Sequence, residues 1–190
     1  MVNRCKWADH NDLMREYHDK EWGTPQHDDR ILYELLILEG MQAGLSWNTV
    51  LHKRDNFREA FDNFDYNKIT KYSEKKIEEL MQNEGIIRNR LKIQSVITNA
   101  KSFVKVQKDL GSFNNYIWGF VNNKVNLNSW KKLEEIPPNS ALSDKISKDM
   151  KKRGFKFIGT TIIYAFLQAI GVVNDHTTDC YRYGELVNSL

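Results

Sequence analysis

Residues 88–107 carry apolar side chains at intervals close to 3.6 residues, the period that places them on one face of an α-helix. Other segments repeat this period, and none shows the regular alternation of apolar and polar residues that is typical of a half-buried strand. The periodic apolar residues of this segment are Leu91, Ile93, Val96, Ile97, Ala100, Phe103 and Val104. The sequence therefore predicts an all-α fold with about eight helices and short connections.

Local signals indicate where several helices begin or end. Asp28 or Asp29 is a suitable N-cap for a helix over residues 30–39, and residues 73–76 open another helix with a carboxylate in its first turn. The two prolines after Ile136 predict a break. Further helices are expected at residues 46–61, 88–107, 113–121, 143–153 and 159–170.

Length and composition favour one compact unit over residues 1–190, or two closely packed lobes, because 41% of the 190 residues are hydrophobic. The net charge of +3 does not by itself indicate a nucleic-acid partner. No run of about 18 apolar residues exists, so no membrane-spanning helix is expected. The first seven residues lack the apolar core of a secretion signal, and two cysteines suit a reducing compartment, so we expect a cytoplasmic location.

Glu39 lies in residues 35–47, whose first part is predicted to be a buried helix. A carboxylate there is costly unless it is paired, hydrogen-bonded or used for function. Gln42 follows at i+3 on the same helix face, and Trp47 comes shortly afterwards. This combination is typical of the wall of a small polar and aromatic pocket. The alternative is a glutamate that reaches solvent near a helix end, which Gly40 could mark.

The two cysteines and two of the histidines form a candidate metal site. Cys5 and His18 lie near the N-terminus, and His176 and Cys180 lie four residues apart near the C-terminus. Two thiolates and two imidazoles make a complete tetrahedral set for a structural zinc ion and leave no position for water. Such a site would join the two ends of the chain and offset a large loop-closure entropy. The alternative is two buried free thiols and two surface histidines.

A basic helix, a glycine-bounded turn and an apolar helix follow one another within residues 143–170. The glycines would let the backbone approach another molecule closely, and Thr160 or Thr161 could cap the second helix, whose free N–H groups would bind a phosphate. This pattern is typical of a helix-hairpin-helix that grips a nucleic-acid backbone without reading its sequence. The alternative is a solvated basic face beside an ordinary turn. The candidate DNA-binding residues are Arg153, Gly154, Lys156, Gly159 and Thr160.

Large aromatic residues gather in the same N-terminal quarter as Glu39. They could form a cage for a flat ligand, or they could be core residues, which is the commoner role of aromatic side chains. A cationic ligand would be attracted both by the ring faces and by the carboxylate. The aromatic residues are Trp7, Tyr17, Trp22 and Trp47.

Several separated motifs follow one another in the order of a known family. They are Arg4-Cys5-Lys6-Trp7, Tyr17-His18-Asp19-Lys20-Glu21-Trp22-Gly23, residues 38–47, Gly85-Ile86-Ile87-Arg88, residues 152–161 and Val173-Asn174-Asp175-His176. On these motifs the chain resembles, almost from end to end, the DNA-3-methyladenine glycosylase I (Tag) family of the helix-hairpin-helix glycosylases. Met41 is a departure, because a second glutamine is familiar at that position.

The resemblance implies a helix-hairpin-helix glycosylase fold near residues 143–170 and one structural zinc ion per chain. The zinc would join residues 5–18 to residues 176–180 through Cys5, His18, His176 and Cys180. The resemblance also implies a base pocket, in which Glu39 and Tyr17 are the candidate catalytic residues. The substrate-binding residues would be Trp7, Trp22, Gln42 and Trp47.

The implied reaction is base excision from alkylated double-stranded DNA. The target base must be flipped out of the duplex to be reached. Methylation at N3 makes adenine a cation and a good leaving group, so Glu39 is expected to select positive charge rather than act as a strong base. Asp175 is a rival catalytic residue, but a supporting role or a helix cap is favoured because it neighbours His176. No lysine directly follows Gly159, so strand cleavage is not expected.

One further class remains open from the residues alone. A non-catalytic, zinc-stabilised DNA-binding module would keep the hairpin and the Cys/His set. It would have no use for Glu39 and its aromatic neighbours, which is why a glycosylase is favoured. Neither a membrane nor an obligate protein partner is expected.

Overall fold

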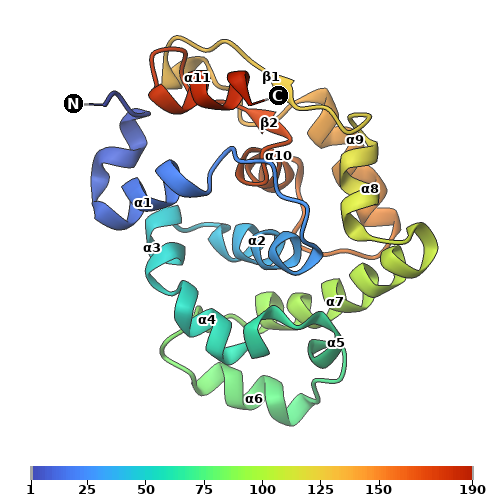
Figure 1. Cartoon of the computed structure of the whole chain (residues 1–190). Coiled ribbons are helices and arrows are strands. Elements are labelled where there is room, and N and C mark those ends of the chain that lie inside the picture. Colours follow the sequence, from blue (N-terminus) through green and yellow to red (C-terminus); the bar gives the residue numbers. More distant parts are fainter. Residues whose placement is uncertain (1, 190) are drawn as a thin grey trace.

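The structure, a computed structural model of the chain, describes residues 2–189, which form an assembly of helices (Figure 1). In chain order the α-helices are α1 (Asp12–Lys20), α2 (Asp29–Gln42), α3 (Trp47–His52), α4 (Arg54–Ala60), α5 (Tyr66–Ile69), α6 (Glu74–Gln82), α7 (Arg90–Leu110), α8 (Phe113–Gly119), α9 (Ala141–Lys152), α10 (Thr160–Ala169) and α11 (Tyr181–Asn188). Short 3-10 helices lie at η1 (Lys6–His10), η2 (Asp62–Phe64) and η3 (Leu133–Glu135). The predicted all-α fold is confirmed.

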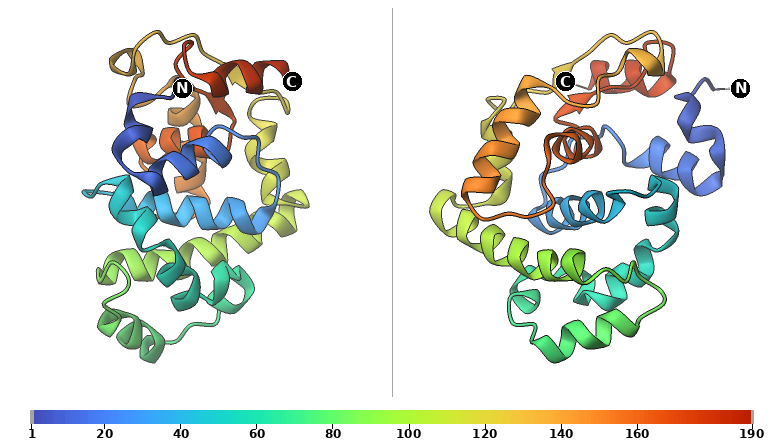
Figure 2. Two further views of the ribbon diagram at one scale, coloured as in Figure 1. Left: turned by 60° about the vertical axis from the view of Figure 1, so that its left-hand side comes forward. Right: turned by 180° about the vertical axis from the view of Figure 1, so that it is seen from behind.

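Helix α2 occupies the centre of the molecule, between α7 on one side and α10 on the other (Figures 1 and 2). Of the two N-cap candidates in the sequence, Asp28 caps the helix and accepts hydrogen bonds from the backbone N–H groups of Arg30 and Ile31. Every residue from Leu32 to Met41 is buried. A helix that is covered on all sides carries apolar residues all round, and Glu39 is therefore conspicuous within it.

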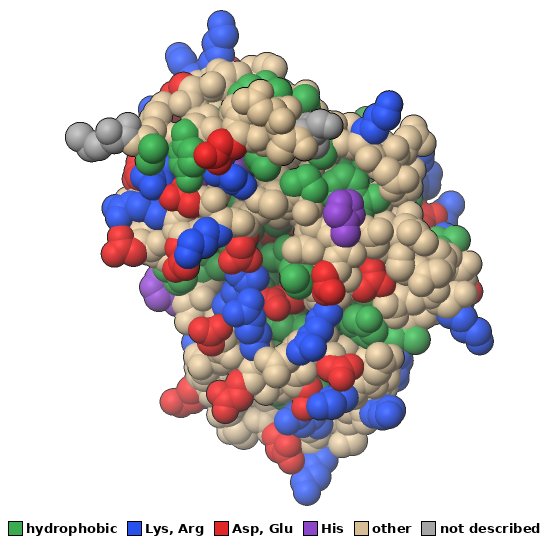
Figure 3. Space-filling view, in the orientation of Figure 1, with side chains coloured by type: hydrophobic (Ala, Val, Ile, Leu, Met, Phe, Trp, Pro, Cys, Tyr) green, Lys and Arg blue, Asp and Glu red, His purple; other side chains and the backbone are tan. Residues whose placement is uncertain are grey.

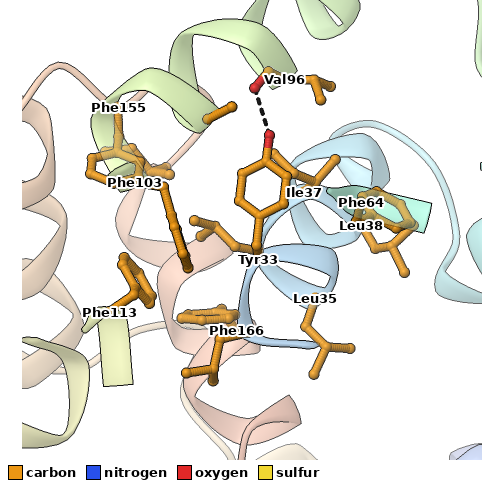
Figure 4. Packing of buried hydrophobic residues seen from close by; sticks show 14 of the residues in the cluster. Tyr33, Leu35, Ile37, Leu38, Phe64, Val96, Phe103, Phe113, Phe155 and Phe166 are labelled. Atoms are coloured by element: carbon orange, nitrogen blue, oxygen red, sulfur yellow. Dashed lines mark hydrogen bonds between the residues drawn. The ribbon is translucent and has the colours of Figure 1, made fainter. Parts of the chain in front are cut away.

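Aromatic side chains from four helices form the core around α2 (Figure 4). The hydroxyl of Tyr33 on α2 donates a hydrogen bond of 2.7 Å to the backbone carbonyl of Val96 on α7. The rings of Phe103 on α7 and Phe113 on α8 stack with their centroids 4.2 Å apart, and Phe166 of α10 packs beside Phe113. Removal of one such ring typically costs about 3–5 kcal/mol, so this core fixes the position of α2.

The single helix predicted over residues 46–61 is wrong, because the structure divides it at Lys53 into α3 and α4. The sequence contains no proline or glycine at this point. The next residue, Arg54, is buried and donates hydrogen bonds to Glu34 at 2.6 Å and to Glu21 at 2.8 Å. These ion pairs accompany the break. They join residues that are far apart in the sequence, so the helical periodicity of residues 46–61 could not predict it.

The structure also contains a short parallel pairing of two strands that the sequence did not predict. Strand β1 (Asn126–Leu127) pairs with β2 (Val173–Asn174) in the register Asn126 with Val173. Two residues per strand are too few to give a detectable alternation. The pairing nevertheless attaches the long connection between α8 and α9 to the segment that follows α10.

The N-terminal segment lies beside the start of α11, near the top of the ribbon in Figures 1 and 2. The backbone N–H of Tyr181 donates to the carbonyl of Asn3 at 2.9 Å, and the Asn3 amide donates to the carbonyl of Asp179 at 2.9 Å. This arrangement brings η1 and α1 against the start of α11. Among residues 2–189, no helix is long and apolar enough to cross a membrane.

Candidate active site

A cavity of about 380 Å³ lies between α2, α10 and the N-terminal segment. Its walls come from η1, α1, α2, α3, α10 and the chain around η3, so segments far apart in sequence meet there. The structure brings together the complete set of pocket residues predicted from the sequence. They are Trp7, Tyr17, Trp22, Glu39, Gln42 and Trp47.

Glu39 enters this cavity from the last turns of α2. Its side chain is buried, with only 4% exposure for the residue, and its Oε2 atom has no hydrogen-bond partner among the described residues. Burial raises the pKa of Glu39 to about 8. A carboxyl group with this environment strongly favours a positively charged neighbour.

Two further polar atoms in the cavity wall have no hydrogen-bond partner in the part of the chain that the structure describes. They are the hydroxyl of Tyr17 and the indole N–H of Trp47, and both are buried. Burial, and then the charge of Glu39, raise the pKa of Tyr17, so its hydroxyl remains a donor. Trp47 and Tyr17 lie with ring centroids 5.3 Å apart, and Trp7 meets Trp22 edge to face at 5.0 Å. The cavity therefore offers two donors, one acid and several ring surfaces to a ligand.

The wall formed by α10 was missed by the sequence analysis. It presents Thr161, Tyr164, Ala165 and Gln168 to the cavity. Their spacing of i, i+3, i+4 and i+7 puts them on one helix face, and the polar Thr161 and Gln168 on this mostly apolar helix were a usable signal. The cavity lining also includes Leu133, Ile136, Pro137 and Pro138, of which only the proline pair stood out in the sequence.

Asp175 lies behind the α10 wall and is completely buried. Its Oδ1 accepts hydrogen bonds of 2.7 Å from Asn128 and from the indole N–H of Trp130. Its Oδ2 accepts bonds from Tyr164 at 2.6 Å and from Gln168 at 2.7 Å. This carboxylate is fully engaged by protein donors, which supports the supporting role favoured from the sequence over a catalytic one.

The four predicted metal ligands form a buried cluster. Cys5, His18, His176 and Cys180 each offer one ligand atom, and these atoms all lie within 4.8 Å of one another. The Cys180 sulfur is 3.4 Å from Nε2 of His18, and the Cys5 sulfur is 3.5 Å from Nδ1 of His176. Zinc bonds of the usual length would separate tetrahedral ligand atoms by about 3.3–3.8 Å, so the cluster fits a metal ion of this kind.

Both histidine rings are oriented for a cation. The second nitrogen of His18 lies 2.8 Å from Asp19 and that of His176 lies 3.1 Å from the carbonyl of Trp22. Each ring can donate to that oxygen and keep its other nitrogen unprotonated as a ligand, although Nε2 of His18 also lies 3.4 Å from the backbone N–H of Cys5. Gly23 permits this arrangement, because a Cβ there would lie 2.8 Å from Nε2 of His176. Both histidines are buried, so the alternative of surface histidines is wrong.

Helices α9 and α10 form the predicted hairpin, with Gly154 at a φ of +94° in the turn between them. The expected threonine cap of α10 is wrong, because the N-cap position is occupied by Gly159, which has no side chain that could cap the helix. The first N–H groups of α10 therefore have no side-chain cap. A Cβ on Gly159 would meet nothing within 4 Å, so another molecule can approach this backbone closely.

The basic residues of the hairpin face different directions. A shallow groove beside Thr160 is lined by Lys148, Lys151 and Lys152, and Lys156 is exposed nearby in the turn. Arg153 instead pairs with Asp149 at 2.7 Å and lies over the ring of a tyrosine on α8. On the face drawn in Figure 3, basic and acidic side chains are interspersed, so positive charge is not gathered into one patch there.

A helical fold with a hairpin of this shape, and a cavity in which an unpaired carboxylate faces aromatic rings, defines an enzyme of the DNA glycosylase class. Residues 7–183 match the family described as Methyladenine glycosylase. DNA-3-methyladenine glycosylase 1 of Escherichia coli (strain K12) is 46% identical over 182 residues, which cover 96% of this chain and 97% of the relative. The chain therefore belongs to the methyladenine glycosylase family.

Solved structures agree with this assignment. A crystal structure of 3-methyladenine DNA glycosylase I (TAG) superposes with a TM-score of 0.92 at 47% identity, covering 94% of this chain and 98% of the other. A variant of 3-methyladenine DNA glycosylase I in complex with 3-methyladenine gives a TM-score of 0.92 at 32% identity, covering 95% and 97%. The structural likeness extends over nearly the whole of each chain.

Proposed function

We propose that this enzyme flips 3-methyladenine out of alkylated double-stranded DNA and hydrolyses its N-glycosidic bond, leaving an abasic site. The observation that carries the proposal is Glu39, a buried carboxyl group in an aromatic cavity, whose Oε2 atom has no hydrogen-bond partner among residues 2–189. One similar structure holds 3-methyladenine. The unpaired carboxyl and the family membership together favour an enzyme over the non-catalytic DNA-binding module.

Glu39 would act by selecting charge. Because its pKa is raised to about 8, the carboxyl of the free enzyme is largely protonated near neutral pH. A cationic methylated base would stabilise the ionised form, whereas neutral adenine would leave a buried charge unpaired. The same negative charge would stabilise positive charge that develops on the sugar as the base departs. A strong general base is unnecessary for this leaving group.

The neighbouring side chains would hold the base in place. Trp7 and Trp47 offer ring surfaces for stacking on a flat cation, and Trp22 supports Trp7 edge to face. The free hydroxyl of Tyr17 would donate to the edge of the base, and Gln42 lies on the same wall as Glu39. Trp7, Trp22, Gln42 and Trp47 would bind and orient the base, and Tyr17, the second candidate catalytic residue, would act through its hydrogen bond to the base.

DNA would reach the cavity by way of the hairpin. The uncapped start of α10 and the lysines beside Thr160 suit a phosphate group. Thr161 also lines the base cavity, so a strand held at this helix start would lie next to the cavity mouth. Such contacts fix position and carry no sequence information, which suits a repair enzyme. Thr160 stands where a lyase would keep its lysine, so we expect an intact strand after excision.

Cys5, His18, His176 and Cys180 would hold one zinc ion. With two sulfur and two nitrogen ligands, the ion would stabilise the junction of the two chain ends and leave no position for water or substrate. The metal would thus be structural, and the residues of the cavity would carry the chemistry.

Release of free base from methylated duplex DNA tests this function. Glu39→Gln keeps the shape of the side chain and removes its charge, so kcat/KM for release of 3-methyladenine should fall about tenfold or more. The exposed Glu59→Gln on α4 is the matched control and should behave like the unmodified protein. Equal activity of Glu39→Gln and the control would contradict the assigned role. Analysis of the DNA product would show whether the strand stays intact.

A further inference from the structure

Gln168 is the one amide of the α10 wall, and the contact behind it determines how it is oriented. Its side-chain Nε2 lies 2.7 Å from Oδ2 of Asp175, and the residue also lines the base cavity. The two ends of an amide are alike in shape but opposite in hydrogen bonding, since the NH2 only donates and the oxygen only accepts. Which end faces the cavity therefore decides which ligands this wall accepts.

The carboxylate of Asp175 leaves no choice between these two orientations. A carboxylate is an acceptor, so only the NH2 of Gln168 can be turned toward it. Tyr164 donates to the same oxygen at 2.6 Å, and burial followed by this hydrogen bond raises the pKa of Tyr164, so the hydroxyl remains a donor. No hydrogen bond to the amide oxygen of Gln168 occurs among residues 2–189, so this oxygen is an acceptor left for a ligand in the cavity that Gln168 lines.

We propose that Asp175 is a positioning residue that locks the Gln168 amide with its oxygen toward the bound base, making Gln168 a specificity-determining residue. This inference rests on the proposed function and concerns which methylated purine the cavity prefers. A fixed acceptor favours a base that presents a donor. The amine at position 6 of adenine is a donor, whereas the carbonyl at position 6 of guanine is an acceptor. The pair thus favours 3-methyladenine over 3-methylguanine.

Asp175→Asn provides a direct test, because the other partners determine how the new amide lies. The indole N–H of Trp130 can only donate, so the oxygen of the new amide must stay at the position of Oδ1. Its NH2 then faces Tyr164 and Gln168. Tyr164 can turn its hydroxyl to accept, and Gln168 must turn its own oxygen toward the new NH2. The donor end of Gln168 would then face the cavity.

The measurement is the ratio of kcat/KM for release of 3-methyladenine to that for 3-methylguanine, both in the same methylated duplex. Asp175→Asn should lower this ratio about tenfold, because one matched hydrogen bond becomes a mismatch for adenine and a match for guanine. A merely structural role would lower both rates together and leave the ratio unchanged. An unchanged ratio would overturn the inference.

Two further variants supply an independent test and a control. Gln168→Met keeps the length of the side chain without a hydrogen-bonding end and should lower the ratio in the same direction, even if Asp175→Asn folds poorly. Trp130→Phe removes a different hydrogen bond to Asp175, from a residue outside the cavity wall, and should leave the ratio unchanged. A ratio unaffected by Gln168→Met would also overturn the inference.

Failure of the proposed function would give a different experimental result from failure of this inference alone. If the unmodified protein released neither base from methylated DNA, the proposed function would be wrong, and this inference would fall with it. If it released 3-methyladenine while both variants kept its preference, the function would stand and only the role of Asp175 and Gln168 would be refuted.

Discussion

Two buried carboxyl groups in this molecule have opposite surroundings. Glu39 at the end of α2 has an oxygen that no other described residue contacts by a hydrogen bond, whereas Asp175 after β2 receives hydrogen bonds from four side chains. Glu39 faces the cavity, and Asp175 lies behind the cavity wall. The first arrangement keeps a polar group available for a ligand at a cost in stability, and the second gives a fixed framework.

The same contrast extends to their neighbours. The Tyr17 hydroxyl and the Trp47 indole N–H share the unpaired condition of Glu39 and line the same cavity. The imidazoles of His18 and His176, near Asp175 in the fold, each have an oxygen partner for the nitrogen that faces away from the cluster. Within residues 2–189, the buried polar atoms without a partner thus include three on cavity-lining residues, and the two others, Nδ2 of Asn174 and Nε of Arg182, lie outside the cavity lining.

The largest expected effect is the loss of thermal stability when the metal is removed from the Cys/His cluster. Because a zinc ion at Cys5, His18, His176 and Cys180 would bind only the folded chain, its removal by a chelator should lower the melting temperature by about 10 °C or more. Thermal unfolding followed by circular dichroism measures this effect, and added zinc should reverse it. His176→Ala should abolish the chelator effect, while the exposed His10→Ala should keep it. Metal analysis finding less than one zinc per chain in protein never exposed to chelator would contradict the site.

Loss of the Asp175 carboxylate should have the next largest effect on stability. Asp175→Ala leaves four donors without their acceptor, so the free energy of unfolding should fall by about 3 kcal/mol. Denaturant titration of this variant against Asp109→Ala, an exposed residue at the end of α7, measures the difference. A loss no greater than that of the control would remove the proposed distinction between the two carboxyl groups.

Glu39 should make the folded protein less stable as pH rises, which is the reverse of the effect of an ordinary paired carboxylate. Its pKa in the folded protein is raised from 4.5 to about 8, so the folded state binds this proton more tightly than the unfolded state. The resulting stabilisation is complete below about pH 4.5 and is lost as pH rises through about 8, a change of roughly 3–5 kcal/mol at most. The comparison with Glu39→Gln isolates this group, because the variant lacks the titration. A constant difference between the two proteins over this range would show that Glu39 is not desolvated.

The smallest effect should come from single basic residues of the hairpin. Lys152 lines the groove beside Thr160, whereas Arg153 is paired with Asp149. Lys152→Ala should therefore reduce the salt dependence of duplex binding by about one unit of slope, and Arg153→Ala should change it less. Fluorescence anisotropy at several salt concentrations makes this comparison. The reverse order would favour Arg153, one of the five DNA-binding residues predicted from the sequence, as the stronger backbone contact.

Much of the fold could be predicted from the sequence because helices are local. The periodicity of residues 88–107 predicted α7, and Asp28 identified the start of α2. The break at Lys53 and the pairing of β1 with β2 could not be predicted, since they accompany contacts between segments far apart in sequence. The wall formed by Tyr164 and Gln168 had a usable helical spacing, but only the folded chain shows which way that face points.

The sequence by itself determined the chemical groups available to this protein. It contains an acid in an apolar helix, tryptophans and tyrosines near it, and two cysteines with two histidines at the chain ends. Only the tertiary structure decided which of these groups are satisfied and which are free. Hydrogen bonding and desolvation depend on neighbours in space, so Glu39 and Asp175 are alike as acids in the printed sequence and differ in the fold.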